Sequence, residues 1–231
     1  MILTCAAMKE LEQRAFSEGV SADALMEEAG LQIARAVRQF FPNPGVCVAV
    51  FGKGNNGGDA LVAARHLAAW GWDVRLVAAF PAADWGPLPK AKFAAAVQCR
   101  NAEIAGLGRI VGEPLVILDG LLGIGASGAL REPLNAITQA FNRRRSSGNA
   151  TVFALDLPTG LNGDTGAADP ACIVADHTLT IGFAKQGLVA DSATNLVGRL
   201  SVLPLGELAK RLAASRQDTV VATPEILRAL R

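Results

Sequence analysis

The sequence has no surplus of charge of either sign. Its 231 residues include 22 Lys and Arg against 21 Asp and Glu, a formal net charge of +1. Such a small field does not gather nucleic acid or an anionic membrane, so we expect neither as a partner. The one basic run, residues 143–145, stands alone without interleaved aromatics and is typical of a solvated helix end. Any phosphate must therefore be bound by a local site.

The sequence is also poor in residues that build disulfides and zinc sites. Its four cysteines (Cys5, Cys47, Cys99 and Cys172) are far apart and form no Cys-x-x-Cys pair. The spacing of a disulfide scaffold or a structural zinc site is therefore missing, and we interpret the cysteines as buried, reduced thiols. With only two histidines, the chain also lacks the usual ligands of a catalytic zinc ion.

Long apolar runs are missing as well. The apolar stretch at residues 1–7 has no basic residue before it, and Lys9 and Glu10 follow before a signal-peptide core could form. Elsewhere charged residues interrupt the apolar stretches well short of the roughly 20 residues that span a bilayer. We expect a soluble, cytoplasmic protein.

What the sequence does contain is a series of short apolar runs. Hydrophobic residues make up 51% of the chain, enough for one large core, and we expect a single domain over residues 1–231 with 215–231 as a tail or linker. The spacing predicts strands at 46–51, 73–79, 115–118, 151–155, 178–183 and 198–203, and helices at 60–69, 133–142 and 205–213. Strands that alternate with helices indicate an α/β fold with a parallel sheet covered on both faces.

The first forty residues predict two helices. One runs over residues 7–17, and Ser21 caps a second helix that places Leu25, Ala29, Ile33 and Val37 on one stripe. We expect both helices to pack outside the sheet. Residues 217–231 have no assigned partner.

Polar residues follow the apolar runs at the points where the strands should end. They are residues 52–59 after the first run, Asp119 after the third, Asp156 and Thr159 after the fourth, and Lys185 after the fifth. In an open parallel sheet, ligands bind outside the carboxyl ends of the strands. Several carboxylates and a lysine on one rim are costly because like charges raise one another's pKa. The rim is therefore the predicted site, although Asp156 could instead cap a helix or form an ion pair, and Lys185 could simply be solvated.

The segment 52–59, GKGNNGGD, matches Gly-x-Gly-x-x-Gly between a predicted strand and helix. Glycines of this kind free backbone amides for a phosphate at the start of a helix, and the alternative is a structural tight turn. The second predicted strand carries its only acid, Asp73, at its entry end. An ordinary NAD dehydrogenase places its ribose-binding acid at the other end, which weakens that interpretation.

Three oxygen-bearing side chains predict a cation site on the same rim. They are Asn56, Asp119 and Thr159, one from each of three strand ends. Hard oxygen ligands suit a hydrated monovalent or divalent ion better than a transition metal.

Five ordered blocks of the chain resemble one known family, the YjeF N-terminal domains that carry NAD(P)H-hydrate epimerase activity. The blocks are GKGNNGGD at 52–59, LDGLLGIG at 118–125, ALDLPTGL at 154–161 with NGDTG behind it, ADHT at 175–178 leading to AKQGL at 184–188, and LMEEAG at 25–30. The likeness covers roughly residues 1–210. It implies a Rossmann-like three-layer α/β/α sandwich with a mainly parallel central sheet.

The resemblance also implies an isomerase of nicotinamide nucleotide repair, which interconverts the R and S forms of hydrated NADH and NADPH (NADHX and NADPHX) at C6. Substrate contacts would fall on Asn55, Asn56, Gly57, Gly58, Asp59, Gly123, Ile124, Gly125, Ala126, Ser127, Gly128, Ala129 and Asp156. Ile124 stands where many members have threonine, and residues 126–129 are richer in small side chains than the common pattern. Backbone amides of this loop would still bind phosphate.

The resemblance further implies one potassium ion per subunit, held by Asn56, Asp119 and Thr159. It implies a homodimer, for which the apolar stripe of the N-terminal helices offers a surface, and a partnership or fusion with an ADP- or ATP-dependent NAD(P)H-hydrate dehydratase. Many relatives carry such a second domain.

The implied reaction needs little beyond one acid/base. The hydrated ring is a carbinolamine, so its nitrogen can expel a protonated hydroxyl and water can return to the other face. Asp156 is our candidate for moving that proton, and Asp59, beside the predicted phosphate loop, is the second choice.

Two other classes of function stay open from the sequence. A catalytically idle nucleotide-binding or scaffold module of the same fold would not need Asp119, Asp156 and the whole Asn-Asn-Gly-Gly-Asp segment. A nucleotide-dependent oxidoreductase would need a bound cofactor. We interpret His66 and His177 as structural, and the tryptophans Trp70, Trp72 and Trp85 as packing residues rather than a nicotinamide platform.

Overall fold

The computed structural model describes residues 1–104, 112–126 and 128–212. Its centre is a seven-stranded sheet in the order β4-β3-β2-β5-β6-β7-β9, and every neighbouring pair is parallel. The strands are β2 (Val46–Phe51), β3 (Asp73–Ala78), β4 (Ala102–Ile104), β5 (Leu115–Gly120), β6 (Thr151–Leu155), β7 (His177–Ile181) and β9 (Arg199–Leu203). The predicted mainly parallel sheet is therefore confirmed.

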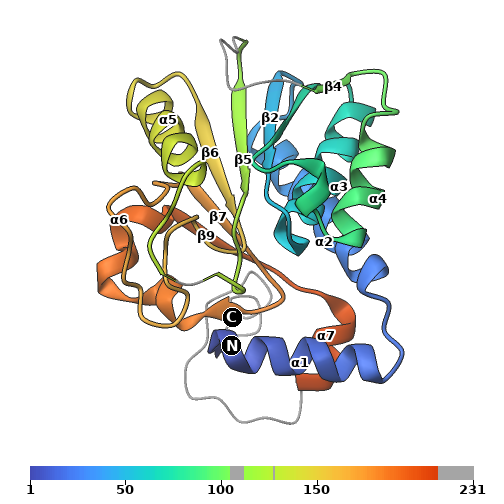
Figure 1. Ribbon diagram of the computed structural model, residues 1–231, viewed down its shortest axis with the longest axis vertical. Coiled ribbons are helices and arrows are strands. Elements are labelled where there is room, and N and C mark those ends of the chain that lie inside the picture. The colour runs from blue at the N-terminus through green and yellow to red at the C-terminus, as the bar shows by residue number, and fades with distance from the viewer. Residues whose placement is uncertain (105–111, 127, 213–231) are drawn as a thin grey trace, which may run out of the picture.

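Helices cover both faces of the sheet, which gives three layers (Figure 1). In β2, Cys47, Ala49 and Phe51 pack into one hydrophobic cluster, while Val46 and Val48 with Val50 pack into another on the opposite face. The first cluster contains α2 (Ala22–Phe40), α3 (Asn55–Ala69) and α4 (Pro87–Ala96), and the second contains α5 (Leu134–Ser146). A strand buried on both faces explains the unbroken apolar run in the sequence.

The N-terminus forms a small structure of its own beside the main sheet. The strand β1 (Ile2–Leu3) pairs in parallel with β8 (Ala184–Lys185), which places Leu3 next to Lys185. The hydroxyl of Thr4 then caps α1 (Cys5–Ser17) by accepting a hydrogen bond from the amide of Ala7 at 3.0 Å. Helix α1 packs against α7 (Gly206–Leu212), and both lie below the carboxyl ends of the central strands (Figure 1).

The remaining short elements lie between these. They are the 3-10 helices η1 (Ala82–Asp84), η2 (Gln186–Val189) and η3 (Asp191–Ala193), and the helix α6 (Thr194–Val197).

Several element predictions were wrong in detail. The helix predicted at 60–69 begins at Asn55, so much of the supposed loop 52–59 is the first turn of α3. A Cβ on Gly57 would lie 2.3 Å from the carbonyl oxygen of Gly52, and one on Gly58 would lie 2.4 Å from the sulfur of Met26. These two glycines permit close packing of α3, which is why a helix start looked like a loop.

Other elements were missed or mislocated. The pattern of apolar residues did not predict β1, α4, β4 or β8. The strand predicted at 178–183 begins at His177 and ends at Ile181, where Gly182 (φ +74°) turns the chain toward β8. The apolar stripe of α2, expected to offer a dimer surface, is buried in the protein's own core: Leu25, Ala29 and Ile33 are all less than a tenth exposed.

The predicted tail, residues 215–231, lies outside the described residues, as does Ser127. Within the described ranges, no helix is both long enough and apolar enough to cross a membrane.

Candidate active site

Asp156 occupies a strained position directly after β6. Its φ is +65°, and among the described residues no other non-glycine residue has a positive φ. This left-handed conformation costs on the order of 1 kcal/mol and persists only where the surrounding structure enforces it. Here the amide of Asp156 donates to the carbonyl of Leu179 at 2.9 Å, which ties the turn to β7. Backbone strain of this kind marks the end of β6 as a candidate functional position.

One carboxylate oxygen of Asp156 accepts hydrogen bonds from three donors. Its Oδ1 accepts hydrogen bonds from the ammonium of Lys185, from the amide of Ile181 at 3.2 Å and from the hydroxyl of Thr180 at 3.4 Å. Lys185 is only 1% exposed and also donates to the carbonyl of Ile181 at 2.9 Å. The alternative in which Lys185 is a solvated lysine is therefore wrong, because this lysine is one half of a buried ion pair.

The other oxygen of Asp156 faces the segment after β5. A Cβ on Gly123 would lie 3.5 Å from Oδ2 of Asp156 and 3.5 Å from Cβ of Asn56. No hydrogen bond between described residues uses Oδ2. Three segments that are far apart in the chain thus meet at this point, namely the start of α3, the segment after β5 and the turn after β6.

The three predicted cation ligands also lie together, joined by hydrogen bonds through Leu122. The amide nitrogen of Asn56 donates to the carbonyl of Leu122 at 2.9 Å, and the amide of Leu122 donates to the hydroxyl of Thr159 at 3.2 Å. That hydroxyl donates to Oδ1 of Asp119 at 2.7 Å, and the amide of Thr159 donates to Oδ2 at 2.9 Å. Burial raises the pKa of Asp119 to about 6, although its hydrogen bonds from Thr159 and Leu121 act in the opposite direction.

The donor set at these three residues fits a hard cation. Oδ1 of Asn56 is buried without a hydrogen-bond partner, and such an atom normally has one. The hydroxyl of Thr159 uses its proton on Asp119 and one lone pair on Leu122, so one lone pair is left. Amide, hydroxyl and carboxylate oxygens are the ligands that such ions take.

The charge of Asp156 acts on two further carboxyl groups. Asp59, in α3, is partly buried, and burial together with the charges of Asp156 and Glu12 raises its pKa well above the usual range. Glu12, in α1, is also partly buried, and burial with the charge of Asp156 raises its pKa to about 7. Sequence reasoning missed Glu12. The available signal was its place one helical turn after the apolar Met8.

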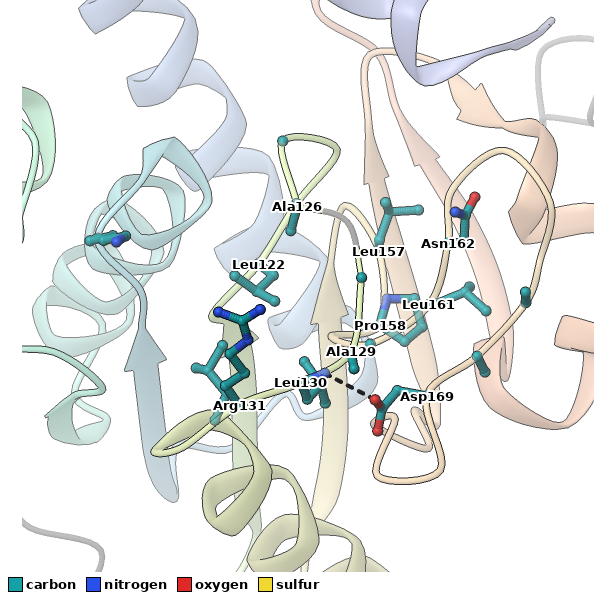
Figure 2. Close-up of a pocket in the computed structure, with 18 of the residues that line it drawn as sticks. Leu122, Ala126, Ala129, Leu130, Arg131, Leu157, Pro158, Leu161, Asn162 and Asp169 are labelled. Atoms are coloured by element: carbon teal, nitrogen blue, oxygen red, sulfur yellow. Dashed lines mark hydrogen bonds between the residues drawn. The ribbon is translucent and has the colours of Figure 1, made fainter.

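A cavity of about 790 Å³ opens between the segments that follow β5 and β6 (Figure 2). Most of the predicted substrate loop lines it, namely Gly123, Gly125, Ala126, Gly128 and Ala129. Ile124 instead packs against the hydrophobic clusters. The opposite wall contains Leu157, Pro158, Leu161, Asn162 and Asp169, and the carboxylate of Asp169 accepts a hydrogen bond from the amide of Leu130 at 2.9 Å (Figure 2).

Two cations that sequence reasoning did not select, Lys53 and Arg131, also line this cavity. Lys53 directly precedes Gly54, the N-cap of α3, which offers no side-chain cap for the first amides of that helix. Helix amides without a cap bind anions. The predicted residue Asn55 begins this helix and is exposed.

The histidine and tryptophan residues that we interpreted as structural pack against other side chains of the protein. His177 stacks on Phe153 with ring centroids 4.5 Å apart, at the beginning of β7 and away from the carboxyl ends of the strands. Trp85 packs edge-on against Phe51, and its indole donates to the carbonyl of Phe80 at 2.8 Å.

Comparison with known proteins decides the family. The family model for the YjeF-related protein N-terminus matches residues 22–187. The chain belongs to this family. NAD(P)H-hydrate epimerases from Rhodopirellula baltica and Elusimicrobium minutum are 34% and 33% identical to this YjeF-related chain, each over 215 residues and 88% of its length, and the matches cover 84% and 95% of those proteins.

A longer relative contains the same region. The bifunctional NAD(P)H-hydrate repair enzyme Nnr of Thermosynechococcus vestitus is 35% identical over 211 residues, which is 88% of this YjeF-related chain but only 39% of that enzyme. The crystal structure of the yeast protein ynu0 matches with a TM-score of 0.70 and 21% identity over 81% of this chain and 82% of its own, which confirms the fold.

Proposed function

We propose that this protein interconverts the C6 epimers of hydrated NADH and NADPH. The observation that carries the proposal is Asp156, a strained carboxylate with one oxygen bound by Lys185 and the other directed toward the Gly123 segment. Membership of the YjeF-related family and its relatives named as NAD(P)H-hydrate epimerases support it.

The proposed reaction is balanced in protons and electrons. The ring nitrogen of the carbinolamine supplies an electron pair, the C6–O bond breaks, and the hydroxyl takes a proton and leaves as water. Water then adds to the opposite face of the planar iminium carbon and returns one proton. Asp156 is placed to handle that proton through Oδ2, because Oδ1 is already bound by three donors.

Phosphate groups of the substrate are the natural ligands for the positive side of the cavity. The first amides of α3 and the side chains of Lys53 and Arg131 supply donors and positive charge there. The glycine and alanine residues of the Gly123 to Ala129 loop would let its backbone approach the dinucleotide closely. A volume of about 790 Å³ lies in the usual range for a pocket that encloses a ligand of this size.

We also propose a potassium ion at Asn56, Asp119 and Thr159. The unpartnered Oδ1 of Asn56 and the free lone pair on Thr159 support it. When bound, the ion would supply a positive charge beside Asp119 and stabilise the junction of the three segments. Proton transfer would still be carried out by side chains of the protein, in this proposal by Asp156.

The proposed partner is an NAD(P)H-hydrate dehydratase, which would consume one of the two epimers. Bifunctional repair enzymes that contain the matched region support this, because the region fills only 39% of the Thermosynechococcus enzyme. A cytoplasmic location and a homodimer remain predictions, and the dimer no longer draws support from α2, whose apolar stripe is buried.

One experiment tests the function directly. One purified epimer of NADPH hydrate is incubated with the protein, and the epimer ratio is followed by chromatography against an enzyme-free control at the same pH. Enzyme-dependent approach to the equilibrium ratio is the expected result. Binding of the hydrate without any acceleration would contradict the proposal and favour an idle binding module.

A further inference from the structure

Helix α1 is fastened to the residues that hold Asp156. Strand pairing places Leu3 beside Lys185, and the amide of Cys5 donates to the carboxylate of Asp164 at 2.6 Å. A Cβ on Gly182 would lie 2.9 Å from the terminal methyl of Met8. The N-terminal segment therefore packs along the turn that connects β7 with Lys185, below the carboxyl ends of the strands (Figure 1).

Glu12 lies on the face of α1 that is turned toward this packing. Cys5, Met8 and Glu12 are three and four residues apart and so share one side of the helix. Met8 is buried and Glu12 partly buried, whereas Lys9 and Glu10 are exposed. Among the described residues, no hydrogen bond or ion pair holds the Glu12 carboxyl.

The charges that face Glu12 come from several elements. They are Asp59 of α3, Asp156 after β6, Lys185 of β8 and Lys9 one turn earlier in α1. Lys185 donates to Asp156, and the charge of Asp156 opposes ionisation of both Asp59 and Glu12. Carboxyl groups that interact in this way titrate as a coupled set, so the last of them to ionise keeps its proton to higher pH.

The other neighbours of α1 do not alter this balance. Arg211 of α7 is paired with Glu18 and Glu207. Burial and the carboxylate of Asp164 raise the pKa of the Cys5 thiol to about 11, so it stays neutral near neutral pH.

We propose that Glu12 is a positioning residue of the epimerase site, whose negative charge helps the neighbouring pair Asp59 and Asp156 to retain the proton that the reaction uses. The proposal rests on the proposed function. Below neutral pH Glu12 is protonated and uncharged. As the pH rises through about 7, Glu12 ionises, and its charge then opposes loss of the remaining proton from the pair. The site should therefore stay competent to higher pH with Glu12 than without it.

The substitution Glu12→Gln tests this, because glutamine mimics the protonated form. At about pH 6 we expect kcat/KM to equal that of the wild type within about twofold. At about pH 9 it should be lower by about 3-fold to 10-fold, since one unit of pKa corresponds to a factor of ten. Glu12→Asp, which restores the charge, should recover part of the difference. Glu10→Gln, exposed on the same helix, is the matched control and should follow the wild type throughout.

A merely structural role would predict a different result. It would lower activity by the same factor at both pH values, together with the thermal midpoint. Parallel pH profiles for wild type and Glu12→Gln would therefore overturn the proposal.

A titration without substrate separates this proposal from the proposed function. Carboxyl ¹³C resonances are followed by NMR in the wild type and in Glu12→Gln, with Asp59→Asn and Asp156→Asn for assignment. We expect Glu12 to titrate near neutral pH and the midpoint of Asp59 to fall when Glu12 is replaced, because the charge of Glu12 raises the pKa of Asp59. A Glu12 that titrates at its ordinary value, with unchanged aspartates, would contradict the proposal. Absence of epimerisation by the wild type would instead reject the function and leave this titration to decide on Glu12.

Discussion

The ammonium of Lys185 and the carboxylate of Asp156 form an ion pair that is buried on both sides, with exposed fractions of 1% and 7% for the two residues. The pair links the turn after β6 to β8, which itself pairs with the N-terminal strand. It leaves Oδ2 of Asp156 facing Gly123. The ion pair with Lys185 thus both positions Asp156, the proposed acid/base, and provides the counter-ion for its carboxylate.

Replacing Asp156 by Asn should abolish most of the activity while preserving binding. Asparagine tolerates the left-handed backbone and keeps most hydrogen bonds, but it does not exchange a proton at neutral pH. We expect turnover to fall by about 10² to 10⁴-fold with nucleotide affinity changed little. Lys185 loses its counter-ion, so stability should fall by up to about 3 kcal/mol. If the variant folds, binds ligand and still turns over at near the wild-type rate, a group other than Asp156 must be the acid/base.

Asp59→Asn is the matched comparison for that experiment. Asp59 is near the start of α3, whose first amides are the proposed phosphate donors. Its replacement should therefore act mainly on affinity, seen as a raised KM, and should lower kcat less than Asp156→Asn does, because Asp156 carries the oxygen proposed to exchange the proton. An equal loss of kcat in both variants would contradict the division of roles between the two aspartates.

Lys185→Met should destabilise the protein strongly, because it leaves the Asp156 carboxylate buried without its partner. The cost of breaking such a pair from one side is about 3–5 kcal/mol, measurable by denaturant unfolding. Combining it with Asp156→Asn removes both charges and should recover part of that loss, although the double variant stays inactive. Additive losses in the double-mutant cycle would show that the two residues do not stabilise each other.

The sequence was sufficient to predict six of the seven strands of the central sheet and the residues at its rim. Unbroken apolar runs such as Val46 to Phe51 predict strands buried on both faces, and the carboxyl ends of parallel strands meet at one edge. Asn56, Asp119 and Thr159 were therefore expected to lie together, and the structure joins them through Leu122.

What the sequence could not predict depends on contacts between distant segments. From the sequence alone, Lys185 looks like a solvated lysine, because the pairing of β8 with β1 is not visible there. Likewise, the sequence presents Glu12 as an ordinary polar residue of an amphipathic helix, because it does not show that α1 packs beside Lys185. The helix start at Asn55 was hidden because two glycines, needed for close packing against Gly52 and Met26, suggested a loop.

Potassium should bind at Asn56, Asp119 and Thr159 and stabilise the protein. Binding to the folded state alone raises stability with ion concentration, so the thermal midpoint should rise in KCl relative to LiCl at equal ionic strength. Crystals soaked with rubidium or thallium should show an anomalous peak within reach of the three side chains. Asn56→Leu removes the unpartnered oxygen and should abolish the difference between the two salts. A peak coordinated elsewhere, or none at adequate occupancy, would remove the cation assignment and leave the proposed phosphate binding intact.

Gly123→Ala should lower turnover without unfolding the protein, because the position is required by chemistry rather than by packing. Its φ is not in the left-handed region, and the added methyl would make ordinary contacts of 3.5 Å with Oδ2 of Asp156 and Cβ of Asn56. The methyl would cover the carboxylate oxygen proposed to exchange the proton, so we expect kcat/KM to fall by about tenfold or more, a barrier increase of about 1.4 kcal/mol. Gly206→Ala, at the start of α7 and not among the residues that line the cavity, is the control: a Cβ there would lie 3.8 Å from Oε1 of Glu28, and the variant should retain most of the activity. Thermal midpoints of both variants should stay close to that of the wild type. If Gly123→Ala turned over as fast as Gly206→Ala, substrate would have to reach Asp156 from another side, and the Gly123 segment would not be the wall of the site.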